Sequence, residues 1–111
     1  MRVSFTIFNE IKGEKMVKKT GDMKEFLKMI GGKGTKEILE FLDENRKGRY
    51  MQFRQYMSTR MLNIRLRELL IFGLVEHHIT KQERKNEWYT ITKKGKKILR
   101  CLKKMEEVIQ E

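Results

Sequence analysis

The chain of 111 residues contains one cysteine, no proline, no alanine and no long apolar segment. The lone Cys101 excludes a framework of disulfides within the chain. No apolar run approaches the roughly 18 residues that a membrane-spanning helix needs. Residues 1–8 are too short and too polar for a signal peptide. The missing proline and alanine indicate no particular function, but the other absences predict a cytoplasmic protein.

The sequence also lacks the motifs of an enzyme. It has no glycine-rich phosphate loop, no cluster of His, Cys and Asp with metal-ligand spacing, and no nucleophile signature. His77 and His78 are the only histidines, and neighbouring strand residues point to opposite faces, so the two cannot share one metal ion by themselves. We therefore expect no catalysis, no cofactor and no metal.

The charge is strongly unbalanced. The chain has 26 Lys and Arg against 15 Asp and Glu, a net charge of +11. This favours a polyanionic partner, because each basic side chain that neutralises a phosphate releases condensed counterions. A solvated surface rich in Lys and Glu, as in heat-tolerant proteins, explains the charge equally well. Composition alone does not decide between a polyanionic partner and a solvated surface. The length of the chain predicts one domain.

Residues 58–75 are the stretch around which we expect the rest of the chain to be organised. Leucines recur there with the spacing i, i+4, i+7 and i+8, which predicts an amphipathic helix over about 59–72. Ser58 or Thr59 can cap its start, and Gly73 can end it in the left-handed conformation. The apolar stripe consists of Leu62, Leu66, Leu69 and Leu70.

The outward face of this helix is polar and basic. At about 100° per residue, Arg60, Ile64 and Arg67 lie opposite the leucines, with Met61 and Asn63 on the flanks. Arg and Asn read guanine and adenine edges bidentately in the major groove, and an aliphatic side chain there can touch a thymine methyl. The pattern predicts a helix that enters DNA.

Before this helix, the N-terminal residues form no clear part of a core. Residues 2–8 alternate polar and apolar, with Val3, Phe5 and Ile7 on one face, and are either a short strand or a loose tail. Residues 12–20 are rich in Gly and Lys and indicate a linker, which is either solvated or an arm that reaches along DNA.

Three helices are expected between this arm and residue 58. The first begins at 20–22 and runs through Met23, Phe26, Leu27 and Ile30. The second begins after Thr35, as its cap, and ends near Gly48, and a short third helix occupies 50–57. The second helix directs Ile38, Leu39 and Leu42 inward, with Phe41 on its flank. A short helix, a tight turn and a helix with outward Arg and Asn make a helix-turn-helix.

A β-hairpin is predicted after Gly73. Val75, His77 and Ile79 alternate with polar residues, Trp88–Thr92 is aromatic and β-branched, and the run 81–86 between them is polar. We expect Tyr89 to be buried, and one histidine to lie in the hairpin core. The hairpin completes the winged-helix order. Its basic tip, Lys81, Arg84 and Lys85, is either an exposed polar turn or a wing on a phosphate backbone or minor groove; the neighbouring helix favours the wing.

The last helix is predicted from Lys93 to about Gln110, with Thr92 as its cap. Ile98, Leu102, Met105 and Ile109 recur at spacings of 4, 3 and 4, the seam of a coiled coil, and Leu99 and Val108 widen it. The far end of this seam needs a cover, either a second copy of the chain or the first helix of the same chain. Cys101 lies beside the seam and is expected to be a packing residue.

The stretch from Glu37 to Gly95 resembles winged-helix transcription regulators of the HxlR type, with MarR- and PadR-like regulators as relatives. Three blocks carry the resemblance: Ile38-Leu39-x-x-Leu42 with Gly48-Arg49-Tyr50; Ser58-x-x-Met61-Leu62-x-x-x-Leu66-Arg67-Glu68-Leu69-x-x-x-Gly73-Leu74-Val75; and Tyr89-x-Ile91-Thr92-x-x-Gly95. The resemblance implies a cytoplasmic, homodimeric DNA-binding regulator that dimerises through its terminal helices. It also implies that Ser58, Arg60 and their neighbours contact DNA and that Arg49 touches its backbone.

Three features depart from the HxlR pattern. The segment from Tyr50 to Ser58 is a few residues shorter than usual, and the wing lacks the prolines that commonly stiffen it. Redox-sensing members use a cysteine near the N-terminal helix, where this chain has none, so redox sensing is not supported.

The sequence therefore predicts a mainly α fold with a small β-hairpin (α+β), a winged helix-turn-helix with an extra N-terminal strand and helix and a long C-terminal dimerisation helix. The expected divisions are 1–20 (strand and arm), 21–92 (DNA-binding domain) and 93–111 (dimerisation helix), within one structural domain. The expected function is sequence-specific binding of double-stranded DNA as a homodimer, with single strands, RNA or a protein as the alternative partner. The predicted DNA contacts are Arg49, Ser58, Thr59, Arg60, Asn63, Ile64, Arg67, Lys81, Arg84 and Lys85, and the predicted dimer contacts are Phe26, Ile98, Leu102, Met105 and Ile109.

Overall fold

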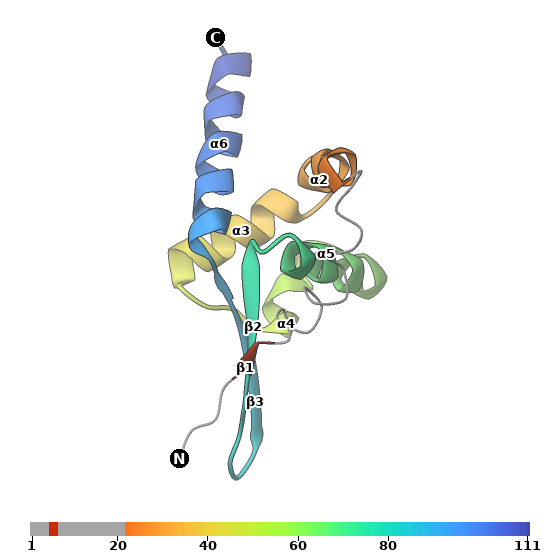
Figure 1. The fold of residues 1–111 in the computed structure, drawn as a ribbon, viewed down its shortest axis with the longest axis vertical. Coiled ribbons are helices and arrows are strands. Elements are labelled where there is room, and N and C mark those ends of the chain that lie inside the picture. Colours follow the sequence, from red (N-terminus) through yellow and green to blue (C-terminus); the bar gives the residue numbers. More distant parts are fainter. Residues whose placement is uncertain (1–4, 7–21) are drawn as a thin grey trace.

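The computed structural model describes residues 5–6 and 22–111. In Figure 1 the β-hairpin and the C-terminal helix lie at opposite ends of the long axis, and the other helices gather beside the junction between them. The elements in chain order are β1 (Phe5–Thr6), α2 (Asp22–Ile30), α3 (Thr35–Asn45), α4 (Tyr50–Phe53), α5 (Thr59–Ile71), β2 (Val75–Lys81), β3 (Lys85–Ile91) and α6 (Lys93–Ile109). The fold is the predicted winged helix-turn-helix, mainly helical with a small hairpin.

The three strands form an antiparallel sheet in the order β1-β2-β3. In β1, Phe5 lies opposite Ile79 and Thr6 opposite His78. The strand expected over 2–8 is thus present at Phe5–Thr6, and its remaining residues lie outside the described part of the chain. The expected arm at 12–20 lies outside it as well.

The hairpin is longer and its turn tighter than the sequence predicted. Val75 pairs with Ile91 at one end and Lys81 with Lys85 at the other, so only residues 82–84 remain for the turn instead of 81–86. Cross-strand hydrogen bonds of the backbone do not require apolar side chains, so pairing continues into the charged run. His77 and His78 lie on opposite faces, as expected, with His77 buried.

One core joins the helices to the sheet. The leucine stripe of α5 is buried, as predicted: Leu62 and Leu69 are 0 % exposed, Leu66 3 % and Leu70 6 %. Ile38, Leu39 and Leu42 of α3 meet it, again as predicted, and Phe41 is partly buried on their flank. Phe53, Leu74 and Leu99 bring α4, the start of the hairpin and α6 into the same core. The core therefore fixes α5 and the hairpin relative to each other.

Two predictions about the helices before α5 were wrong. Thr35 does not cap α3 from outside; Gly34 (φ 87°) holds that position, and the buried Thr35 hydroxyl donates to the carbonyl of Met29 at 2.7 Å. The predicted third helix shrinks to the four residues of α4, because a turn follows Phe53. Ser58 then caps α5, accepting from the Met61 amide at 3.2 Å, and Gly73 (φ 77°) follows its end.

Helix α6 sits closely on the start of the hairpin. Thr92 caps it as predicted, accepting from the Gly95 amide at 2.9 Å and donating to the Gly73 carbonyl at 2.7 Å. Gly95 is buried against Leu74, where a Cβ would lie 2.2 Å from the Leu74 carbonyl oxygen. Further along α6, Glu106 pairs with Lys36 of α3 at 2.6 Å. These contacts fix which face of α6 points to solvent.

Candidate nucleic-acid interface

The outward face of α5 is exposed. Arg60, Asn63 and Arg67 are all exposed, and Ile64 is 42 % exposed. Met61 is partly buried against the core, so it belongs to the helix support and not to the open face. The structure therefore brings the four side chains that the sequence selected for base contact onto one accessible surface.

Asn63 is held by a neighbouring element. Its Oδ1 accepts a hydrogen bond from the Tyr50 hydroxyl of α4 at 2.7 Å. Asn63, Arg67 and Tyr50 line a hollow of about 290 Å³ that reaches Tyr89 of β3. The amide oxygen retains a second lone pair and the Nδ2 both its hydrogens, so the group can still donate and accept toward a base. Sequence reasoning missed this link, because nothing in the spacing pairs Tyr50 with Asn63.

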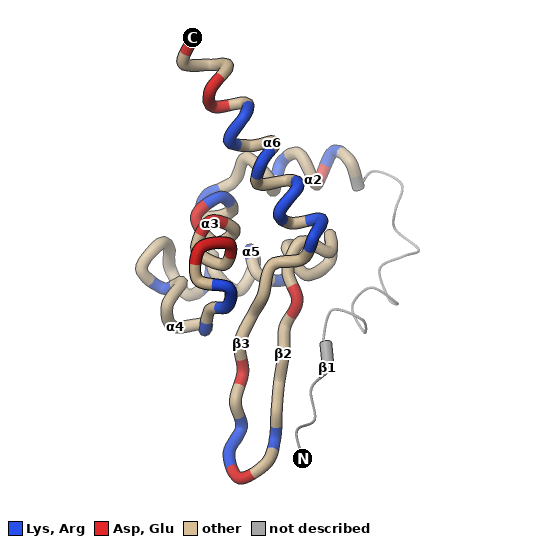
Figure 2. The backbone as a smooth tube through the Cα atoms, turned by 90° about the vertical axis from the view of Figure 1, so that its left-hand side faces the viewer, with Lys and Arg blue, Asp and Glu red and all other residues tan. Residues whose placement is uncertain are grey.

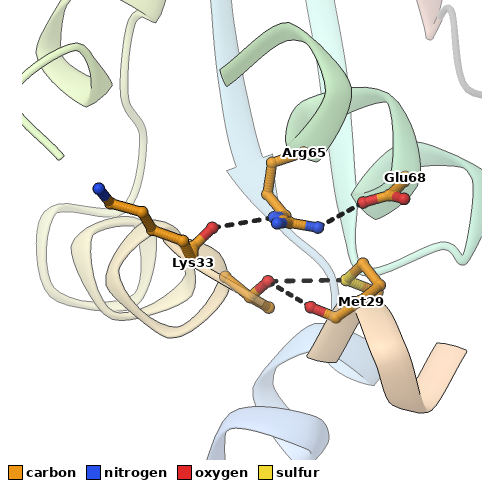
Figure 3. Close-up of polar contacts among 5 residues, drawn as sticks. Met29, Lys33, Arg65 and Glu68 are labelled. Carbon is orange, nitrogen blue, oxygen red and sulfur yellow. Dashed lines mark hydrogen bonds and ion pairs between the residues drawn. The ribbon is translucent and has the colours of Figure 1, made fainter. Parts of the chain in front are cut away.

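Arg65 is the side chain on α5 that sequence reasoning missed most clearly. It is 6 % exposed, and Figure 3 shows its guanidinium reaching across to the turn between α2 and α3. There its Nε donates to the Lys33 carbonyl at 2.9 Å, while Nη1 pairs with Glu68 at 2.6 Å. Charged hydrogen bonds in a buried setting are strong and directional. These contacts link α5, the candidate recognition helix, to the turn between α2 and α3.

The hairpin tip carries mixed charge. Lys81, Arg84 and Lys85 are exposed there, as predicted, but Glu83 lies among them, and Figure 2 shows both signs of charge around the tip. Lys85 pairs with Glu87 at 2.7 Å, and this hydrogen bond lowers the pKa of the Glu87 carboxyl below its ordinary value of 4.5. Of the three basic residues, Lys85 is thus already engaged within the hairpin.

Arg49 is exposed and also tied to the hairpin. Its Nη1 donates to the Glu87 carbonyl at 3.4 Å. The neighbouring Gly48 forms two backbone hydrogen bonds with Tyr89, of 3.0 Å and 2.8 Å. The segment before α4 and the third strand are therefore joined, which places Arg49 between the two elements expected on DNA.

The aromatic side chains of the hairpin are covered. Tyr89 and Trp88 are each 9 % exposed, which agrees with the expectation for Tyr89. Burial raises the pKa of the Tyr89 phenol to about 12. His77 stacks on Tyr89 and His78 on Trp88, with ring centroids 4.5 Å and 5.4 Å apart. These rings are not open platforms for stacking of unpaired bases.

The terminal helices α2 and α6 expose apolar side chains. Leu27 is 58 %, Met23 68 % and Met105 55 % exposed, and Ile109 reaches 83 %. Phe26, Ile98 and Leu102 are partly buried against the core. A groove of about 440 Å³ lies between the far end of α6 and the α2–α3 turn. Cys101 does not pack into the chain as expected; it is exposed.

The described residues contain neither a candidate metal site nor a candidate membrane-spanning helix. No group of three or more His, Cys, Asp or Glu side chains there has the arrangement of a metal site. Likewise, no helix in residues 22–111 is long and apolar enough to cross a membrane.

The model of the HxlR-like helix-turn-helix family matches residues 29–111, from the end of α2 to the C-terminus. The chain belongs to this family. It is therefore a DNA-binding transcription regulator of the winged helix-turn-helix class.

A solved structure agrees with the family assignment. The chain is similar to "Redoxregulator HypR in its reduced form", with 27 % sequence identity and a TM-score of 0.64 over 78 % of this chain and 87 % of that one. No curated protein sequence matches the chain. The family match covers α5, the hairpin and α6 in full, so the site described above lies on the part of the chain that the family model matches.

Proposed function

We propose that this HxlR-like regulator binds double-stranded DNA in a sequence-specific manner as a homodimer, in the cytoplasm. The observation that carries the proposal is the single open face of α5, on which Arg60, Asn63, Ile64 and Arg67 stand opposite a fully buried leucine stripe. Arg and Asn donate to base edges in the major groove, and Ile64 offers an apolar surface for a thymine methyl.

The flanking contacts position α5 on the duplex. Ser58 and Thr59 stand at its N-terminus, where a free hydroxyl hydrogen and backbone amides face a phosphate. Lys81 and Arg84 at the hairpin tip grip the backbone or enter the minor groove, and Lys85 does so when it leaves Glu87. Arg49, held beside the hairpin, is the remaining backbone contact.

The homodimer forms through the apolar faces of the terminal helices. On α6, the seam runs from the partly buried Ile98 and Leu102 to the exposed Met105 and Ile109. On α2, Phe26 lies on the same side of the core and lines a hollow with Ile98. Exposed apolar surface of this kind marks interfaces, and a second copy covers it by symmetry. The two copies of α5 in the dimer are then expected to lie about 34 Å apart, which is one turn of DNA.

Selection of duplexes from a random pool at physiological salt tests this proposal. We expect enrichment of a pseudo-palindrome whose half-sites are one helical turn apart, because a two-fold protein reads a two-fold site. Parallel titrations with single-stranded DNA and with RNA serve as comparison. Tighter binding to either of these than to any duplex would reject the proposal, as would a pool that stays random.

A further inference from the structure

The basic side chains of α6 form a second charged surface that the reading helix and the hairpin do not use. Seven of the twelve residues at 93–104 are basic, and all seven are exposed. At 100° per residue, four of them lie in one line along the helix with spacing i, i+4, i+7 and i+11, about 16 Å long. This line, the α6 ridge, consists of Lys93, Lys97, Arg100 and Lys104; Lys94, Lys96 and Lys103 flank it.

The ridge is not neutralised within the described chain. Across residues 22–111, no ion pair involves any of the seven basic side chains. The acidic residues of α6 are Glu106, Glu107 at its far end and Glu111 just beyond, and Glu106 already pairs with Lys36. Even if a partner copy contributed all three glutamates, four of the seven cations would stay unpaired. Within α6 itself, positive charges therefore outnumber negative ones, in one copy of the helix or in two.

This accumulation of charge weakens the helix that carries it. Like charges at i and i+4, such as Lys93 with Lys97 and Arg100 with Lys104, repel each other. Three lysines also stand in the first turn of α6, where the helix dipole favours acidic side chains and none is present. A surface that contradicts local helix preferences in this way is typical of a functional contact.

The packing of α6 keeps the ridge turned to solvent. Gly95 and Leu99 are buried on the opposite side, and the close approach of Gly95 to the Leu74 carbonyl prevents the helix from rolling. The apolar seam that we assign to the dimer also lies on that buried side. In both views of the molecule, α6 and the hairpin tip are at opposite ends, so the ridge points to a different region of a ligand than the tip does (Figures 1 and 2).

We propose that the α6 ridge binds the phosphate backbone of double-stranded DNA without sequence preference, on a segment separate from the one that α5 reads. Six of the seven cations on and beside the ridge are lysines, which act as point charges toward phosphates and lack the planar fork of donors of arginine. The ridge carries no aromatic side chain, so it offers unpaired bases nothing to stack on. One molecule would thereby hold two duplex segments at once.

The test compares two double variants of the full chain that each remove two charges. Lys97→Gln with Lys104→Gln changes the ridge, and Lys24→Gln with Lys28→Gln changes exposed lysines of α2. Affinity for a random duplex is measured from 50 to 200 mM salt. We expect the slope of log affinity against log salt to become less steep by about 1.8 for the ridge variant, since each lost phosphate contact removes about 0.9. The α2 variant should leave the slope unchanged.

A bridging assay separates this proposal from the function of α5. Protein bound to an immobilised duplex is incubated with a second, fluorescent duplex, and the fluorescence retained after washing is measured. The ridge variant should lose retention while still binding the first duplex, whereas the α2 variant should retain both. Glutamine keeps helix propensity, and removing repulsion should leave the melting temperature unchanged or higher. Equal behaviour of the two variants in slope and retention would overturn the proposal.

The outcome for the ridge does not depend on the outcome for α5. In an Arg60→Ala, Arg67→Ala background, sequence preference is expected to vanish while ridge-dependent binding to random duplex persists. If the random-pool selection fails but Lys97→Gln with Lys104→Gln weakens this residual binding and makes its salt slope less steep, the proposed function is wrong and the ridge is right. If the ridge changes leave the residual affinity and its salt slope unchanged, the ridge is wrong.

Discussion

The Arg65 guanidinium binds the backbone carbonyl of Lys33 at 2.9 Å, so α5 is anchored to the turn between α2 and α3 (Figure 3). The same group pairs with Glu68 one turn further along α5. A movement of α2 relative to the core would therefore act on the helix that carries the proposed base contacts. The α2–α3 turn and α5 are thus linked by a polar contact.

Replacement of Arg65 by methionine should destabilise the protein by about 1–3 kcal/mol, because it leaves the Lys33 carbonyl without its partner and Glu68 without its cation. Urea denaturation measures this loss. Arg67→Met on the exposed side of the same helix is the matched control, expected within about 0.5 kcal/mol of the wild type. Similar losses for both variants would contradict the assigned role of Arg65.

The contact of Gly95 with the hairpin predicts a strong effect of a single methyl group. In Gly95→Ala the Cβ would lie 2.2 Å from the Leu74 carbonyl oxygen, a backbone atom that cannot move aside cheaply. We expect a loss of about 1–3 kcal/mol or more from overpacking, seen as a lower melting temperature. Gly31→Ala is the control, because the nearest atom to its Cβ is 3.7 Å away. A neutral Gly95→Ala would show that α6 docks more loosely than described.

Substitutions on α5 and on the hairpin should affect DNA binding differently. Arg60→Ala or Arg67→Ala should cost about 1–3 kcal/mol on the selected site and little on random DNA, since base contacts are lost. Lys81→Ala should weaken all sequences alike and reduce the salt slope by about 1. Titrations on specific and random duplexes distinguish the two. Equal losses on both kinds of DNA would mean that the arginines grip only the backbone.

Ile109→Lys should convert the dimer to monomers, because it places a charge in the proposed seam where Ile109 is 83 % exposed in the single chain. Sedimentation equilibrium measures the change. Gln110→Lys adds the same charge at the next position and should leave the dimer intact. Persistence of the dimer in Ile109→Lys would move the interface to another surface.

The stability of the folded protein should depend on pH through Glu87 of the hairpin. The hydrogen bond from Lys85 lowers the pKa of Glu87 below 4.5, so the carboxylate stabilises the folded state above that pH and the contribution is lost as the pH falls through the lowered value. We expect Glu87→Gln to be less stable at pH 7 and to lose less stability on acidification than the wild type. Fluorescence of the single Trp88 during urea unfolding reports this at each pH. Glu83→Gln removes an exposed carboxylate in the turn of the same hairpin, so it is the matched control for the loss of one negative charge and should keep the wild-type stability at pH 7.

The elements that the sequence predicted well are those specified by local pattern. The period of the leucines in α5, the Ser58 cap and Gly73 fix that helix and its open face, and the alternation after Leu74 fixes the hairpin. The contacts that it missed join distant segments. Arg65 stands one turn from both Leu62 and Leu69, a signal of burial, but its partner is 32 residues away. Thr35 is of a residue type that commonly caps helices. Its hydroxyl instead donates to the Met29 carbonyl, a contact that only the folded chain brings about.

The two backbone hydrogen bonds between Gly48 and Tyr89 have a consequence for solubility. A small sheet with an unpaired outer strand invites pairing with the strand of another molecule, which leads to aggregation. Here Gly48 pairs with Tyr89 on the outer side of β3, where that strand is buried. On the other side of the hairpin, β1 pairs with the outer side of β2. The ends of β2 and β3 next to the turn carry the charged residues Lys81 and Lys85. The hairpin can therefore project into solvent without presenting a template for β-sheet growth.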